Sequence, residues 1–313
     1  MTKKRNFIKL GSAASVLSLA LAGCVLFPTP KEEFVKGYET IETAKTVESS
    51  TTFQLTAKET AGHKNLDTET KDMLKLLNSA SINLHTISDN VKKQSESDLN
   101  ISGKLAGLNV NLDLNSFIDE KAKRLYMKTD KYADVLGSIA SLTGYNVNVK
   151  LPTQLKGKII DLGKYKQNEL IDNTKIGDYP DDHFTKKGDV ITLRVSGKDL
   201  KEDIFKSLEN TASSLGENVG EEDLDTMMKV MEKHLTIGEV TDKATVQKGI
   251  LKKQDITVPM SLNTKGSPIE LELNIRTVYD NIDKPAKFSY KVNNEKTLTM
   301  DEVEKKLTDS MFK

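Results

Sequence analysis

Several segments of this chain alternate strictly between apolar and polar residues, and this pattern limits the folds that the chain can adopt. From Leu108 to Leu114, every second residue is leucine or valine, and the residues between them are asparagine or aspartate. A period of two predicts strands with one buried and one solvated face, as antiparallel sheets have. The same period recurs at residues 53–57, 82–84, 99–105, 256–262, 269–275 and 288–292, and a further strand is expected at 124–128, which carries Leu125, Tyr126 and Met127. We therefore expect an α+β fold built on a large, mainly antiparallel sheet.

Short connections between these strands predict hairpins. Lys104–Gly107 separates two alternating runs, and Lys265–Pro268 separates two more. The two halves also echo each other, because Leu-Asp-Leu-Asn at 112–115 resembles Leu-Glu-Leu-Asn at 271–274. Likewise, Arg-Leu-Tyr-Met-Lys at 124–128 resembles Lys-Phe-Ser-Tyr-Lys at 287–291. Either the body consists of two similar meanders joined into one broad sheet, or the echo reflects a residue pattern common to many strands.

Helical periodicity interrupts the strands at several points. Apolar residues recur every three or four positions from Lys31 to Ala44, and further helices are expected at 133–142, 199–214 and 221–234. Strands are expected between them, at 157–162 and 190–195. In the last helix Met227, Met228 and Met231 cannot all face the same way. We interpret this helix as bordering an irregular apolar partner, or else as buried on two sides.

The N-terminal segment predicts where the protein is located. Four basic residues precede and border an apolar stretch at about 7–22, which is followed by Leu-Ala-Gly-Cys at 21–24. This order is typical of a secretory signal. Cys24 is the single cysteine of the chain and stands at the cleavage site, so the segment resembles the lipobox of bacterial lipoproteins. The alternative is an ordinary signal peptide with a chance cysteine.

The lipobox divides the chain into three parts. We expect a signal peptide at 1–23 cleaved between Gly23 and Cys24, a short tether at 24–30, and one α+β domain at 31–313. A helical insert would occupy about 199–235 of that domain. The lipid on Cys24 would be its membrane anchor, on the extracytoplasmic face of the cell membrane.

Charge and motifs narrow the possible functions. The chain has 46 basic and 46 acidic residues. Four of the basic ones lie in the predicted signal, so the mature body is mildly acidic and a nucleic-acid partner is not expected. The four histidines have no ligand-like spacing, and we find no motif of a nucleophile or phosphate loop. We expect no catalytic residues, no metal site and no cofactor.

The order of lipobox, tether, amphipathic helix and alternating strands with helices midway resembles lipoproteins of the LolA and LppX/LprG type. Leu-Tyr-Met-Lys at 125–128 and Lys-Ile-Ile-Asp-Leu at 158–162 contribute to this resemblance, which covers residues 31–292. It implies a curved, half-barrel-like sheet with helices packed on its concave face, where lipid is carried. The low aromatic content is typical of lipoproteins of Gram-positive bacteria.

The apolar faces outnumber the helices available to cover them, and this surplus predicts a hydrophobic ligand site. We expect it to include Leu108, Val110, Leu112, Leu114, Met227, Met231, Leu271 and Leu273. Our first hypothesis is a non-enzymatic carrier of lipid or another hydrophobic ligand. The alternative is an envelope scaffold that docks a protein partner. A solute-binding transporter subunit fits less well, because such subunits usually have parallel sheets.

Overall fold

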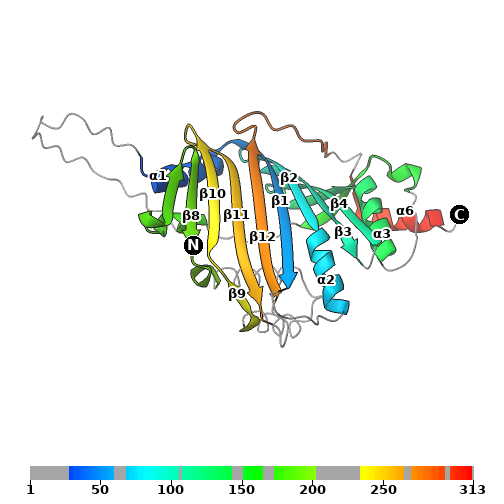
Figure 1. Cartoon of the computed structure of the whole chain (residues 1–313). Helices are drawn as coiled ribbons and strands as arrows, with labels where there is room; N and C mark the ends of the chain where they lie inside the picture. The colour runs from blue at the N-terminus through cyan, green and yellow to red at the C-terminus, as the bar shows by residue number, and fades with distance from the viewer. Residues whose placement is uncertain are drawn as a thin grey trace, which may run out of the picture.

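The computed structural model describes residues 28–59, 68–105, 108–142, 151–164, 173–201, 233–263, 269–292 and 297–311. It shows an α+β fold with one mostly antiparallel sheet of 13 strands (Figure 1). The strand order is β13-β6-β5-β4-β3-β2-β1-β12-β11-β10-β8-β7, with β9 paired beside β11. The sheet is open, since its path ends at β13 and β7. The expected fold class is thus confirmed at this level.

The sheet consists of two meanders. The first runs in chain order through β1 (Thr46–Glu59), β2 (Ser81–Asp89), β3 (Gln94–Leu105), β4 (Leu108–Asp119), β5 (Arg124–Lys128) and β6 (Ile159–Lys164). The second runs through β7 (Phe184–Lys187), β8 (Val190–Val195), β10 (Val240–Gln247), β11 (Ile250–Leu262) and β12 (Ile269–Asp280). The antiparallel pair β1–β12 joins them, from Glu48 opposite Asp280 to Glu59 opposite Ile269. The two runs of strands are thus joined in one broad sheet. Of the two sequence echoes, only that between 112–115 and 271–274 falls on strands in both halves, because 287–291 is not a strand.

Two short strands complete the sheet. The strand β9 (Leu235–Ile237) pairs antiparallel with the end of β11, where Ile237 lies opposite Met260. At the far edge, β13 (Thr297–Thr299) pairs parallel with β6. Both predicted hairpins are confirmed by the pairing of β3 with β4 and of β11 with β12.

The predicted strand at 288–292 is wrong. After β12, the chain makes a turn at 281–284, and residues 285–292 then form a crossing segment without ladder pairing. Phe288 and Tyr290 of this segment pack on Phe117 of β4, whereas Ser289 and Lys291 are exposed. An extended chain lying on a sheet face buries every second side chain just as a strand does. The period of two therefore could not distinguish the two arrangements.

Four helices border the sheet in the described residues. These are α1 (Pro30–Thr43), α2 (Thr68–Ser79), α3 (Thr129–Leu142) and α6 (Met300–Met311). The helix α1 begins with a capping box, in which Thr29 and Glu32 accept from each other's backbone N–H. The helices α1 and α3 were predicted, but α2 and α6 were not. The predicted helices between 199 and 234 lie almost entirely outside the described residues.

The connections also contain three short 3-10 helices, η1 (Thr153–Leu155), η2 (Asn173–Asp178) and η3 (Asp181–His183). Among the described residues, no helix combines the length and the apolar character needed to cross a membrane.

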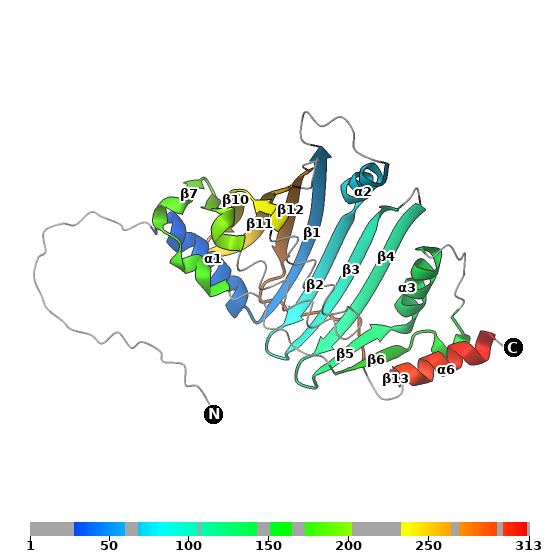
Figure 2. The same ribbon diagram turned by 90° about the horizontal axis from the view of Figure 1, so that it is seen from below.

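The helices α1 and α2 lie on the same face of the sheet. Phe34 of α1 belongs to a core cluster that Tyr279 borders, and Leu74 of α2 belongs to one that Leu271 borders. Tyr279 and Leu271 are separated by an even number of residues on β12, so their side chains leave the sheet on the same side. Figure 2 shows α1 near the β7–β11 end and α2 beside β1 and β2.

A candidate ligand-binding face of the sheet

One face of the central strands carries a continuous row of large apolar side chains. Across five neighbouring strands, the register places Ile275 opposite Phe53, Phe53 opposite Ile82, Ile82 opposite Ile101, and Ile101 opposite Leu112. Opposed residues in neighbouring strands point to the same face. With strands about 4.8 Å apart, this row spans about 19 Å from β12 to β4.

Neighbouring rows extend this surface along the strands. Leu84, Leu99 and Leu114 form one row across β2, β3 and β4, and Leu55 lies opposite Leu273. We call the combined set the apolar patch: Phe53, Leu55, Ile82, Leu84, Leu99, Ile101, Leu112, Leu114, Leu273 and Ile275. All ten side chains are half-buried. None belongs to a buried core cluster formed by the described residues, so the patch is not part of their packed core.

The packed clusters surround the apolar patch. The α1 cluster covers β8, β10 and the start of β11, and the α2 cluster covers Ala57 and Ile269 at one end of β1 and β12. Beyond β5, α6 covers Ile160 of β6 through Val303 and Leu307. The helices α1, α2 and α6 therefore occupy the margins of this face.

Charge distinguishes the two faces sharply. On the face of the patch, the described side chains of β12, β1, β2, β3 and β4 include no acidic or basic group. The opposite face of the same strands carries many: Glu48, Lys58, Asp89, Glu96, Asp98, Lys104, Asp113, Asp119, Glu270, Glu272, Arg276 and Asp280. We call these the apolar face and the polar face. Only the apolar face offers an environment suited to hydrocarbon.

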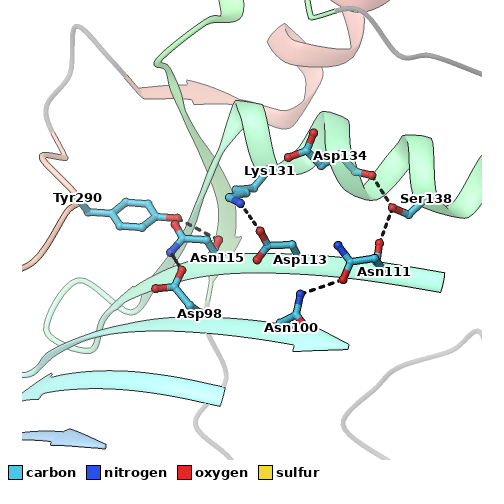
Figure 3. A network of polar contacts seen from close by, with 9 residues as sticks. All are labelled: Asp98, Asn100, Asn111, Asp113, Asn115, Lys131, Asp134, Ser138 and Tyr290. Atoms are coloured by element: carbon cyan, nitrogen blue, oxygen red, sulfur yellow. Dashed lines mark hydrogen bonds and ion pairs between the residues drawn. The ribbon is translucent and has the colours of Figure 1, made fainter. Parts of the chain in front are cut away.

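The polar face is held by a network of hydrogen bonds (Figure 3). Lys131 of α3 forms an ion pair with Asp113 of β4, and Ser138 of α3 donates to the backbone carbonyl of Asn111. The hydroxyl of Tyr290, from the crossing segment, donates to the backbone carbonyl of Asn115 at 3.0 Å. These contacts fix α3 and the crossing segment against β4.

A hollow of about 310 Å³ opens on the polar face. Its lining includes Thr56, Lys58, Glu270 and Glu272, which alternate with residues of the apolar face, and it also touches Met260 and Leu271 of that face. It is therefore not the apolar cavity that a hydrophobic-ligand carrier would use.

The structure brings part of the predicted ligand site together. Leu112 and Leu114 on β4 share the apolar face with Leu271 and Leu273 on β12, separated by β1, β2 and β3. At the backbone level Leu108 and Val110 continue the same face of β4, although their side chains are outside the described set. Met227 and Met231 also lie outside the described residues.

Sequence reasoning missed the centre of the patch. Phe53, Ile82, Leu84, Leu99 and Ile101 lie between the two predicted halves of the site. Their alternation marked them as strand residues. Only the pairing of β1 with β12 shows that they bridge the two halves.

A buried polar cluster lies where α1 meets the apolar face. The hydroxyl of Tyr38 donates to Asp242 Oδ2 at 2.8 Å, and Gln254 Nε2 donates to the same oxygen at 2.9 Å. Asp242 Oδ1 is shielded from solvent and has no hydrogen-bond partner. Burial raises the pKa of Asp242 to about 6, although the two hydrogen bonds oppose that shift. Burial together with Asp242 raises the pKa of Tyr279 to about 12.

Asp242 makes stability fall as pH rises. Because its pKa is higher in the folded chain than the ordinary 3.8, the folded chain binds an extra proton between about pH 4 and pH 6. The free energy of unfolding therefore decreases across this window. From pH 4.5 to pH 8 we expect the wild type to lose about 2 kcal/mol relative to Asp242→Asn, in urea unfolding followed by circular dichroism.

Asp255 provides the control for this prediction. Burial alone would raise the pKa of Asp255, but its ion pairs with Lys253 and Arg276 lower it overall. Asp255→Asn should therefore change the pH dependence in the opposite direction. Identical pH profiles for the wild type and Asp242→Asn would contradict the assignment.

Two of the described histidines, His85 and His183, contact neighbouring side chains. His85 Nε2 lies 3.0 Å from Glu48 Oε1, and the ring of His183 stacks on Tyr179. Within the described ranges, no group of three or more His, Cys, Asp or Glu residues is placed to hold a metal ion.

Comparison with protein-family models, curated proteins and solved structures finds no match to this chain.

Proposed function

We propose that this protein is a membrane-anchored extracytoplasmic lipoprotein that binds or carries a lipid or another hydrophobic ligand on its apolar face. The observation that carries the proposal is the apolar patch. Ten large, half-buried side chains form one surface on five strands whose described side chains carry no charge on that face, and they lie outside the packed clusters of the described residues. Large contiguous apolar surfaces of this kind commonly mark binding sites.

The proposal includes the anchor and the shape of the site. The lipid on Cys24 holds the chain at the membrane, and α1 connects that tether to the sheet beside the apolar face. The apolar face is the concave side of a half-barrel-like sheet, with helices along its margins. A ligand chain lying there gains about 0.8 kcal/mol for each methylene group it buries. The protein acts without catalysis, since binding alone requires no reactive group.

Photocrosslinking to the full chain in detergent tests this function. We expect a diazirine-bearing fatty acid to crosslink to peptides of β1–β4. Ile82→Asp places a carboxylate at the centre of the patch, where burying it without a partner is costly, and should reduce crosslinking at least about tenfold. Asn83→Asp is the matched control, because Asn83 is exposed on the polar face and should have no effect.

Equal crosslinking of Ile82→Asp and the wild type would contradict the site. If no crosslink maps to the sheet of a folded wild type, the protein is instead better described as an envelope scaffold that docks a protein partner.

A further inference from the structure

A row of hydroxyl groups borders the apolar patch on the same face. The row lies two residues further along each strand than Thr51, Leu84, Leu99 and Leu114. In it, the register places Ser49 opposite Thr86, Thr86 opposite Ser97, and Ser97 opposite Ser116. We call these four residues the hydroxyl row. Ser49 also lies opposite Tyr279 of β12, so hydroxyl groups follow one another across five strands. The apolar face is therefore amphipathic along the strands, with hydrocarbon at its centre and hydroxyls at one border.

The hydroxyl row has unused hydrogen-bonding capacity. Thr86 and Ser97 contact each other at 3.3 Å between their hydroxyl oxygens. In the part of the chain that the structure describes, the side chains of Ser49 and Ser116 have no hydrogen-bond partner. A hydroxyl offers one donor and two acceptor positions, so even the bonded pair can bind further groups. All four side chains are half-buried, which leaves them accessible from the patch.

Among the described side chains of β12 and β1–β4, none on the face of the hydroxyl row is acidic or basic. The acidic side chain of Asp242, on β10, shares this face, but it is buried beside Tyr38 and offers no cation. A phosphate placed at the row would lose water without gaining a cation, which is strongly unfavourable. Glycerol hydroxyls and ester carbonyls, by contrast, find matching donors and acceptors.

From this arrangement we infer that the ligand is an uncharged lipid with a hydroxyl-bearing head, of the diacylglycerol kind. Its head lies at the hydroxyl row, and its acyl chains lie over the apolar patch. The inference rests on the proposed function, because it specifies which lipid the same face accepts. The chemistry that decides between lipids is the charge of the head, since the acyl chains contact the same patch in every case.

Two photoreactive lipids with identical diazirine acyl chains test the inference on the full chain in detergent. One is a diacylglycerol and the other a phosphatidylglycerol, and adducts are quantified by intact mass and located by peptide mapping. We expect at least about tenfold more diacylglycerol adduct on peptides of β1–β4, because a buried unpaired phosphate costs more than the 1.4 kcal/mol that this ratio represents.

Ser97→Lys provides the decisive variant. It places an ammonium group at the centre of the row and should shift the preference towards phosphatidylglycerol, whereas Asn83→Lys on the polar face should leave the ratio unchanged. Equal labelling by both lipids on the sheet of the wild type, or an unchanged ratio in a folded Ser97→Lys, would overturn the head-group inference and leave the proposed function standing. Absence of sheet adducts with either lipid would overturn both.

Discussion

A Cys24→Ala variant should leave the membrane fraction almost completely once its signal has been cleaved. Two or more acyl chains hold a protein stably to a bilayer, and the proposed lipid on Cys24 is the only anchor in our account. We expect at least a tenfold decrease in membrane-bound protein, a conservative figure given about 0.8 kcal/mol per buried methylene. Fractionation in high salt, with intact mass to establish cleavage, measures this.

Two other outcomes of the Cys24→Ala experiment have different meanings. A variant that stays uncleaved is retained by its signal, and mass spectrometry identifies this case through the extra 23 residues. A cleaved variant that still sediments with membranes in high salt would contradict the lipobox.

Phe34→Ala should lower the free energy of unfolding by about 3–5 kcal/mol. Phe34 is fully buried between α1 and the sheet, and its ring lies 5.1 Å from that of Tyr38 and 5.4 Å from that of Phe184. Removing the ring leaves a cavity at the contact between α1 and the β-sheet. Urea unfolding followed by circular dichroism measures the change.

The exposed Glu39 on the same helix serves as a control for Phe34→Ala. Glu39→Ala should change the free energy of unfolding by no more than about 0.5 kcal/mol. A loss below about 1 kcal/mol in Phe34→Ala would mean that α1 contributes little to the folded body.

The alternation of apolar and polar residues predicted strands correctly where the same segment both pairs in the sheet and buries every second side chain. The bounds of β8, Val190–Val195, are those expected from the sequence, and the hairpin partners β3 and β4 pair as expected. The same pattern failed at residues 288–292, because an extended segment lying on a sheet also buries alternate residues. The helix α6 was missed, although Met300, Val303 and Leu307 recur at helical spacing and pack in one cluster. Among its described residues most of the others are exposed, so the apolar stripe is short.

The candidate site was predictable only in part, for a physical reason. Periodicity shows which residues of one strand share a face, so Leu112 and Leu114 could be grouped, as could Leu271 and Leu273. It does not show which strands are neighbours. The pairing of β1 with β12 connects residues more than 200 positions apart and places Phe53 and Ile82 between the two groups.

The hydroxyl row illustrates the same limit. Ser49, Thr86, Ser97 and Ser116 come from four strands, and nothing in their individual sequence surroundings relates them. Each lies two residues from a member of the neighbouring row, so the register alone aligns them. A ligand preference based on this row therefore follows from topology rather than from a motif.

If the apolar face holds a lipid, that lipid should copurify with the full chain. After detergent extraction and purification from cells, lipids should be released by solvent and quantified by mass spectrometry. We expect a near-stoichiometric uncharged lipid with the wild type and with Asn83→Asp, and its loss from a folded Ile82→Asp. No bound lipid in the wild type, or equal amounts in all three proteins, would contradict this expectation.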